Sequence, residues 1–451
     1  MTEHLRPLDT SLLHVEDADR HTHLGMGALA VLDGPIPDHE SLISTLGERI
    51  SACPRFAQRL RRRVFDLGAP EWVHDGNFSL ARHVCRVAVP SPGSDDELFA
   101  VVAELMSWRL DRDRPLWEIW AIEGLSGGRW ALLVKVHPCV ADAVATVHIL
   151  AGLSDEGVAH GSRPGAANSA ESAGPRTGWH GALSTAASIA VDAMMGVAQA
   201  EQMLRGAAEV ATGLLRPVGP LNGPLTSRRR YTAARVRAAE VDQICRTFDV
   251  TVDEVALAAI TESYRNILIR RGRRPQPGSL RTLVPTRQAV LLPRLPVDED
   301  NPVVRLRLVH ARLAEATVAA ERSNLMRAAA RAVPAPMTAW ATNLVSRLPQ
   351  RSVVALAAPV AGPELPLQIM GRTVSAVFPI PPIALQLRTG AAILRYADEL
   401  FFGILADYDA VADADELARG IEAAVRRLLV RSKRPRRSGR DRHGLALVVN
   451  V

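Results

Sequence analysis

The chain has 451 residues, of which 47% are hydrophobic and 23% charged, so a mainly disordered protein is excluded and two or three domains are expected. Its four cysteines lie far apart and form no C-x-x-C pair, which argues against a disulfide scaffold and favours a reducing compartment. The net charge is +6, but residues 431–442 alone contain seven cations and one anion. The rest of the chain is therefore close to neutral, which argues against a nucleic-acid-binding surface on the folded part.

The first part of the sequence predicts a mixed α/β segment. Short apolar runs indicate strands, and apolar residues at helical spacing indicate helices. The predicted strands are 28–32, 84–89 and 130–137, and the predicted helices are 37–50 and 94–110.

A second α/β segment is predicted after a change in composition near residue 154. Its clearest helix, 251–270, begins with Thr251 and Glu254 at the spacing of a capping box. The other predicted elements are strands at 280–285, 373–379, 391–396 and 400–406, and an amphipathic helix at 413–430.

These patterns predict five consecutive parts of the chain. Residues 154–178 are rich in Gly, Ser, Ala and Pro and lack apolar periodicity, which is typical of a flexible linker. No run of about 20 apolar residues is present, so no membrane-spanning helix is expected, and no secretory signal is expected either. The expected parts are an N-terminal lobe (1–153), the linker (154–178), connecting helices (179–216), a C-terminal lobe (217–430) and a basic tail (431–451).

The stretch that says most about chemistry is residues 129–150, RWALLVKVHPCVADAVATVHIL. A buried strand is predicted to end at His137, where Pro138 prevents regular continuation. Asp142 follows at the expected start of an apolar helix. A strand, a turn with an imidazole and a helix start with a carboxylate can hold a histidine at a domain interface.

This stretch resembles the H-H-x-x-x-D-G motif of the bacterial wax ester synthase/diacylglycerol acyltransferase family. The likeness covers roughly residues 5 to 430, with further family motifs in the same order. They are Pro7-Leu8-Asp9, His23-Leu24-Gly25, Pro54-Arg55-Phe56, Leu110-Asp111-Arg112 with Arg114-Pro115-Leu116-Trp117-Glu118, Asn222-Gly223-Pro224 with Arg228-Arg229-Arg230, and Phe402-Gly403 with Asp407 and Asp409.

The resemblance implies an α/β fold of two chloramphenicol-acetyltransferase-like lobes around a central channel. It also implies an acyl-CoA-dependent O-acyltransferase that forms triacylglycerol from diacylglycerol, or wax ester from a long-chain alcohol. Acyl-CoA would be a substrate, and no cofactor or metal is expected. The expected location is cytoplasmic, with the basic tail as a candidate contact to anionic membranes or lipid droplets.

The sequence departs from the family motif at two positions. The family's general base is the second histidine, which would take the proton of the acceptor hydroxyl, but Pro138 stands there. Ala143 replaces the closing glycine, and Asp142 keeps its expected role of ordering the loop. His137 remains as the candidate catalytic residue, but it matches the first histidine and is expected to face away from the position of the base.

Several alternatives stay open at this stage. The protein could be a weakened enzyme, or a catalytically inactive homologue that binds acyl chains or pairs with an active acyltransferase. His137 could be a buried histidine bonded to backbone. We expect Cys139 and Trp117 to be packing residues and His148 to be a satisfied core histidine.

Overall fold

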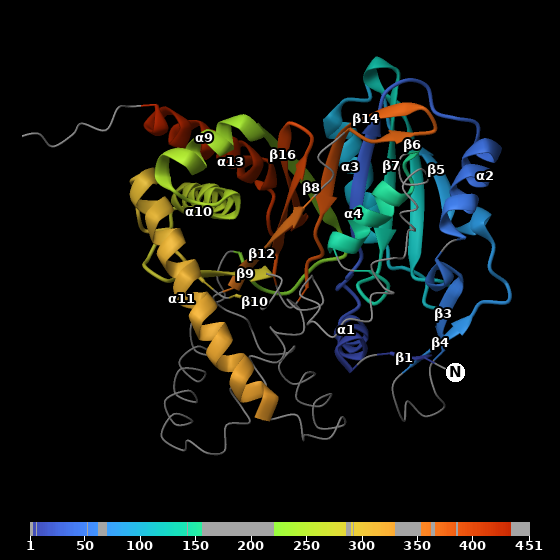
Figure 1. Cartoon of the computed structure of the whole chain (residues 1–451), viewed down its shortest axis with the longest axis horizontal. Helices are drawn as coiled ribbons and strands as arrows, with labels where there is room; N and C mark the ends of the chain where they lie inside the picture. Colours follow the sequence, from blue (N-terminus) through green and yellow to red (C-terminus); the bar gives the residue numbers. More distant parts are fainter. Residues whose placement is uncertain are drawn as a thin grey trace, which may run out of the picture.

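The computed structural model describes two α/β lobes that stand side by side (Figure 1). Much of the predicted linker, the connecting helices, Asp142 and most of the basic tail lie outside the described residues. The described residues are 3–5, 7–51, 53–61, 70–141, 143–155, 221–285, 290–291, 293–329, 353–361, 366–384 and 387–433.

A six-stranded sheet forms the centre of the N-terminal lobe. Its strand β7 (Arg129–Val136) pairs antiparallel with β2 (Met26–Leu32) on one side and with β6 (Trp117–Leu125) on the other. β5 (Val84–Ala88) runs parallel to β6 at the edge. β2 and nearly all of β7 are buried, as expected for apolar runs in a sheet that is covered on both faces.

Two helices of this lobe begin where the sequence supplies capping groups. Ser94 and Glu97 form a capping box at the start of α3, and the Asp38 carboxylate accepts the N–H of Ser41 at the start of α2. The helices are α1 (Pro7–Ala18), α2 (His39–Ile50), α3 (Asp95–Ser107) and α4 (Ala143–Gly152), with 3-10 turns at Pro54–Ala57, Leu80–Arg82 and Ser126–Gly128, and a small sheet of β1 (Glu3–His4), β4 (Glu71–His74) and β3 (Gln58–Arg61).

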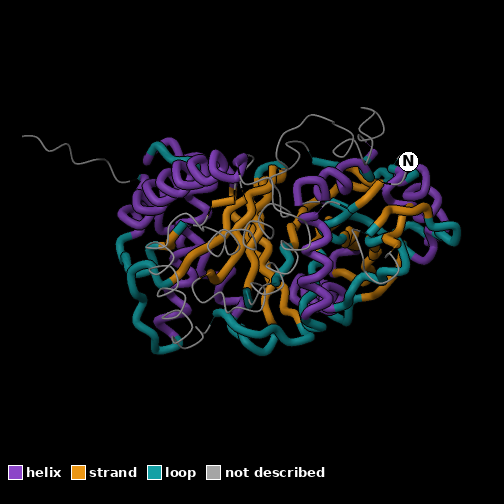
Figure 2. The backbone as a smooth tube through the Cα atoms, turned by 90° about the horizontal axis from the view of Figure 1, so that it is seen from below, coloured by secondary structure: helices purple, strands orange, loops and turns teal. Residues whose placement is uncertain are grey.

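The C-terminal lobe is built on a second sheet with helices packed against it (Figure 2). The predicted capping box of Thr251 and Glu254 is confirmed at the start of α10. The strand order is β10 (Val290–Leu291), β9 (Leu280–Pro285), β12 (Val353–Ala361), β15 (Thr389–Tyr396), β16 (Glu399–Asp407) and β8 (Arg229–Arg237), with β11 (Arg294–Leu295) paired to β9; the helices are α9 (Ala238–Phe248), α10 (Val252–Arg270), α11 (Pro302–Ala329) and α13 (Ala414–Ser432).

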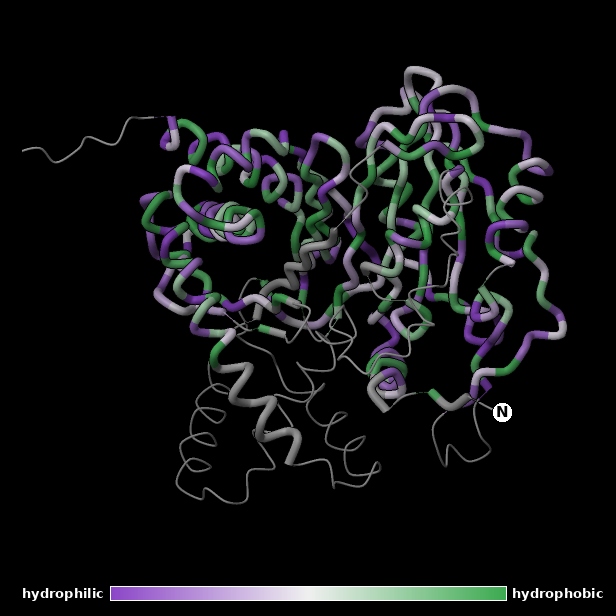
Figure 3. The backbone as a smooth tube through the Cα atoms, in the orientation of Figure 1, coloured by the Kyte–Doolittle hydropathy of each residue, from purple (hydrophilic) through white to green (hydrophobic). Residues whose placement is uncertain are grey.

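Two large hydrophobic clusters form the core, and the inner strands of both lobes are hydrophobic (Figure 3). One cluster lies within the C-terminal lobe, and the other fills the N-terminal lobe and continues across the boundary to Tyr231, Leu394 and Phe401 of the second sheet. The predicted strands 28–32, 84–89, 130–137, 280–285, 373–379, 391–396 and 400–406 and the predicted helices 37–50, 94–110, 251–270 and 413–430 each overlap an observed element of the same type.

One hairpin of the C-terminal part of the chain belongs to the N-terminal sheet. β14 (Arg372–Ile380) pairs antiparallel with β2, and β13 (Gln368–Ile369) pairs with β14. The predicted lobe of 217–430 is therefore not one spatial unit. The physical reason is that β2 would otherwise expose a row of unpaired backbone groups at the edge of the sheet. The hairpin turn is held in place by Asp155, whose carboxylate accepts the N–H groups of Met370 and Gly371 at 3.0 and 2.7 Å.

The crossing strand also passes close to the C-terminal sheet. Tyr231 of β8 donates its hydroxyl to the carbonyl of Pro379 at 3.1 Å, and Gly403 of β16 lies beneath the same carbonyl. A Cβ atom at Gly403 would be 1.6 Å from the Pro379 oxygen, so only glycine fits there. The Phe402-Gly403 motif thus has a packing role at the junction of the lobes.

Candidate functional site

The predicted site residue His137 lies at the end of β7, in a turn that leads to α4. Its backbone N–H donates to the carbonyl of Leu116, and its own carbonyl accepts the N–H groups of Val140 and Ala141 at 2.8 and 3.3 Å. α4 packs on β2 and β7 and also touches β12 of the other lobe. The turn therefore stands next to the boundary between the two lobes.

The imidazole of His137 is 2% exposed, is hydrogen-bonded at Nδ1 and faces a carboxylate with Nε2. Nδ1 accepts the backbone N–H of Cys139 at 3.1 Å, and Nε2 lies 3.6 Å from Oε2 of Glu16. Because Nδ1 accepts a hydrogen bond, the neutral ring carries its proton on Nε2, which faces the carboxylate. The lone pair that a general base would use is thus occupied by a backbone group.

Glu16 of α1 is the buried carboxylate that faces this ring. Its Oε1 accepts the N–H of Leu24, and its Oε2 accepts from Arg112, both at 2.8 Å. Burial alone would raise the pKa of Glu16, but the adjacent His137, the Leu24 N–H and Arg112 together hold that pKa well below its usual range. Glu16 is therefore an anion that orients the histidine.

Two arginines that follow α3 bind the C-terminal end of α1. Arg109 donates to the carbonyls of Glu16, Asp19 and Thr22, and Arg112 donates to that of Leu13. Cations at this end of a helix satisfy its last carbonyls and favour its dipole. They fix the segment that carries Glu16.

His23 lies next to Arg109, one of these two arginines. Its Nδ1 accepts from Nε of Arg109 at 3.3 Å. Burial, together with the charges of Arg229 and Arg109, lowers the pKa of His23 to about 4. His23 is therefore neutral at physiological pH.

The single lysine of β7 also has a structural role. Nζ of Lys135 donates to the carbonyls of Leu105 and Trp108 at the end of α3, at 2.8 and 2.7 Å. Burial lowers the pKa of Lys135, while Glu118 at 3.7 Å opposes that shift.

Cys139 is poorly suited to be a nucleophile. Its thiol donates to the carbonyl of Asp9 at 3.5 Å, and burial raises its pKa well above the ordinary value. Within the described residues, no group of three or more His, Cys, Asp or Glu side chains is arranged to hold a metal ion.

Two sequence motifs from the C-terminal part meet at the lobe boundary. Arg229 and Asp407 are fully buried and lie 3.8 Å apart, and Thr226 donates its N–H and its hydroxyl to Asp407 at 2.5 and 3.0 Å. Arg229 also reaches the N-terminal lobe, where it donates to the carbonyl of His21, and its backbone N–H donates to Ser107. The pair thus ties β8 and β16 to the segment that leads to His23.

Comparison with known proteins identifies the family. Residues 5–256 match the family model of the wax ester synthase/diacylglycerol acyltransferase catalytic domain, and residues 287–429 match that of the WS/DGAT C-terminal domain. The chain belongs to the wax ester synthase/diacylglycerol acyltransferase family. The predicted family and function class, an acyltransferase, are confirmed at this level.

Among its relatives, the protein of Mycobacterium tuberculosis named probable diacylglycerol O-acyltransferase tgs1 is 52% identical over 99% of this chain and 100% of its own length. A putative diacylglycerol O-acyltransferase of the same species is 40% identical over 95% of this chain and 91% of its own length.

Solved structures confirm the predicted two-lobed fold. The wax ester synthase/diacylglycerol acyltransferase from Marinobacter aquaeolei VT8 matches with a TM-score of 0.69 and 23% identity, over 95% of this chain and 100% of that one. The first condensation domain of the CDA synthetase matches with a TM-score of 0.56 and 13% identity, over 96% and 97% of the two chains.

The other residues singled out from the sequence have mixed outcomes. Trp117 is a core residue as expected, since its Nε1 donates to the carbonyl of Phe56 and its ring packs on the Phe56 ring. The prediction for His148 is wrong, because this residue lies on the exposed side of α4. Asp142 lies outside the described residues. The sequence does not single out Glu16. Nothing in a short helix indicates that one of its carboxylates faces His137, which lies 121 positions further along the chain.

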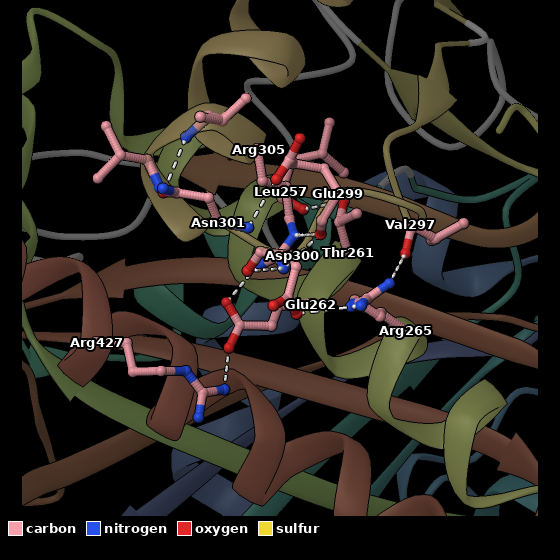
Figure 4. Close-up of polar contacts among 12 residues, drawn as sticks. Leu257, Thr261, Glu262, Arg265, Val297, Glu299, Asp300, Asn301, Arg305 and Arg427 are labelled. Atoms are coloured by element: carbon pink, nitrogen blue, oxygen red, sulfur yellow. Dashed lines mark hydrogen bonds and ion pairs between the residues drawn. The ribbon is translucent and has the colours of Figure 1, made fainter. Parts of the chain in front are cut away.

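A second polar network lies in the C-terminal lobe, away from the turn (Figure 4). Glu262 of α10 is buried and pairs with Arg305 of α11 and Arg427 of α13. Arg305 also donates to the carbonyl of Glu299 at 2.7 Å. Burial and the nearby charge of Arg265 lower the pKa of Arg305 to about 10. This network joins three helices, so we assign it to stability.

No helix among the described residues is long and apolar enough to cross a membrane.

Proposed function

We propose that this chain is a diacylglycerol O-acyltransferase, which uses acyl-CoA as the acyl donor and needs no cofactor. The observation that carries this proposal is the 52% identity with the relative named diacylglycerol O-acyltransferase, over the whole of both chains. In the reaction, the acceptor oxygen attacks the thioester carbonyl carbon, a C–O bond forms and the C–S bond breaks. CoA leaves as a thiol that takes up the hydroxyl proton. A long-chain alcohol as acceptor would give a wax ester by the same step.

We propose that this chain transfers acyl groups more slowly than family members that keep the second histidine. Pro138 stands at the position of the family's base and has no proton-accepting side chain. The Nδ1 lone pair of His137 is occupied by the Cys139 N–H, so His137 is a poor replacement. A general base contributes typically 10²–10⁴-fold, and binding and orientation supply the rest. The same two observations favour a second candidate, an inactive homologue that binds acyl chains or pairs with an active acyltransferase.

The test combines turnover with direct binding. The purified full chain is mixed with labelled palmitoyl-CoA and either dioleoylglycerol or hexadecanol, and the esters are separated and counted. Triacylglycerol formation supports the proposed function, and preferential ester formation with hexadecanol reassigns the acceptor. Saturable binding of palmitoyl-CoA without either product favours the inactive homologue. Absence of both binding and product contradicts the enzyme and the acyl-binding homologue, and leaves the homologue that pairs with an active acyltransferase.

We propose that the protein reaches its lipid substrate at a membrane or lipid-droplet surface. The cations of residues 431–442 support this proposal, because clustered arginines attract anionic lipid surfaces.

A further inference from the structure

The three consecutive arginines at the start of β8 are divided between two faces of the strand. Side chains alternate along an extended chain, so Arg228 and Arg230 share one face and Arg229 takes the other. Arg229 is buried with Asp407. Arg228 and Arg230 instead lie against the ring of Tyr408, with their Cζ atoms 3.8 and 4.5 Å from its centroid.

The positive charge of this stacked group is not neutralised. In the described part of the chain, neither Arg228 nor Arg230 forms an ion pair, and Nε of Arg230 is buried without a hydrogen-bond partner. A third cation, Arg388, lies at the same end of the sheet. Its carbonyl accepts the N–H of Asp407, and its Nε donates to the carbonyl of Pro224 at 3.4 Å. Asp409, which follows Tyr408 in the sequence, is an exposed acid.

This arrangement suits a phosphate group. An aromatic face holds the plane of a guanidinium by cation–π contact and leaves its edge N–H groups free to donate. Planar guanidinium edges match the oxygens of a phosphate, and such charge-assisted bonds are strong. Two like charges held on one ring repel each other, so an anion between or beside them would relieve that repulsion.

We infer that Arg228, Arg230 and Arg388 bind phosphate groups of the acyl-CoA donor. This inference rests on the proposed function, in which the donor carries phosphates at the end of the molecule opposite the thioester. Arg229, which lies between Arg228 and Arg230 in the sequence but on the opposite face of β8, donates to the carbonyl of His21. In the same segment the N–H of Leu24 donates to Glu16, which faces His137.

The test measures binding of CoA to the full chain by calorimetry, so it does not depend on turnover. We expect Arg228→Ala and Arg230→Ala each to weaken CoA binding about tenfold or more. Binding of pantetheine, which lacks the phosphates, should be unchanged in both variants. Arg237→Ala is the matched control, because Arg237 is an exposed arginine at the other end of the same strand. This control should bind CoA like the native chain.

Three results would overturn the inference. The first is unchanged CoA binding in a variant that carries both Arg228→Ala and Arg230→Ala. The second is a loss of pantetheine binding as large as the loss of CoA binding. The third is a loss of CoA binding in Arg237→Ala as large as in the other variants. A further measurement is the binding of the same variants to phosphatidylglycerol vesicles. If the variants lose vesicle binding and keep CoA binding, the phosphate belongs to a lipid headgroup and the inference is wrong.

Two further measurements keep the test decisive. If the alanine variants do not fold, competition of 3′,5′-ADP with CoA on the native chain replaces them, and absence of competition counts against the site. If the native chain binds CoA through these arginines but forms no ester, the inference stands and the proposed function fails.

Discussion

The ring of His137 illustrates how one backbone group can decide whether an imidazole accepts a proton. The N–H of Cys139 occupies its Nδ1 lone pair, and the carboxylate of Glu16 faces Nε2. These contacts come from the turn and from α1, and neither uses the side chain of Pro138. His137 is therefore better placed to position the turn than to act as a base.

We predict that Pro138→His combined with Ala143→Gly, which restores the family motif, raises acyl transfer to diacylglycerol by about tenfold or more, because a general base contributes typically 10²–10⁴-fold. The measurement is the initial rate of triacylglycerol formation at saturating acyl-CoA.

His137→Ala in the native chain serves as the control for this prediction. It should lower the residual rate only to the extent that it loosens the turn, with unchanged pH dependence. If it abolishes a substantial native rate and removes a titration from the pH profile, His137 is the base. A double variant that folds, binds acyl-CoA and gains no rate would also contradict the prediction.

The buried His23 makes stability depend on pH. Its folded pKa of about 4 lies below its unfolded value of 6.5, so the unfolded chain binds the extra proton first. The contribution is present above pH 6.5 and is lost as the pH falls from 6.5 toward 4. We expect about 2 kcal/mol less stability at pH 5 than at pH 7 from this group.

Urea unfolding at the two pH values measures this loss. His23→Gln cannot take up the proton and should show a correspondingly smaller difference. Glu16, with its lowered pKa, adds a loss of its own only below its unfolded value of 4.5, outside this comparison. An equal pH effect in native chain and variant would assign the proton uptake to another group.

At the scale of elements, local signals sufficed where a pattern and its caps lay within one segment. The helix that begins at Thr251 and the strand that ends at His137 are examples. β12 was not predicted because Pro359 lies within it, and a proline usually argues against an inner strand. The pairing of β14 with β2 joins residues more than 300 positions apart, and nothing local encodes it.

In the candidate site, too, local features could be predicted from the sequence and long-range contacts could not. The sequence placed His137 at a strand end before a turn and a helix, and the structure has this arrangement. The partners of its ring could not be predicted, because Glu16 and Arg112 converge on it only through the packing of α1 against the segment after α3. Gly403 was matched as a motif, but the carbonyl of Pro379 that requires it belongs to another sheet.

We predict that Gly403→Ala is strongly destabilising. The new Cβ would overlap the Pro379 oxygen, so β14 and β16 would have to separate at a tightly packed junction. Overpacking of this kind costs about 1–3 kcal/mol or more. The measurement is the free energy of unfolding in urea, with Gly76→Ala as the control because no atom lies within 4 Å of its Cβ position. Equal effects in the two variants would contradict the close approach.

At the scale of the whole molecule, the lobes are held together by many different contacts. The crossing strand β14, the hydrogen bond from Arg229 to the carbonyl of His21, and the packing of α3 against β8 all span the boundary. The lobes should therefore unfold as one cooperative unit and not as two domains joined by a linker.

The basic tail is expected to act separately from this unit. α13 ends at Ser432, so deleting residues 434–451 leaves the helix whole and removes five arginines. We predict weaker binding to anionic vesicles, by at best about 1 kcal/mol per cation at low salt, and an unchanged melting temperature. Co-sedimentation with vesicles and thermal unfolding are the measurements. A lower melting temperature would show that the tail packs on the folded part.

The crossing strand also affects how the protein is made. The ribosome synthesises β2, β6 and β7 early. The strand that pairs with the open edge of β2 is β14, which is complete only at Ile380. A ribosome that adds 5–20 residues per second needs roughly 12–50 s for the roughly 240 residues between β7 and the end of β14. During that time the nascent sheet presents an apolar strand with unpaired backbone groups, the usual starting point of aggregation. Synthesis of this protein should therefore depend on chaperones that cover the nascent chain, and premature termination before residue 380 should leave insoluble fragments.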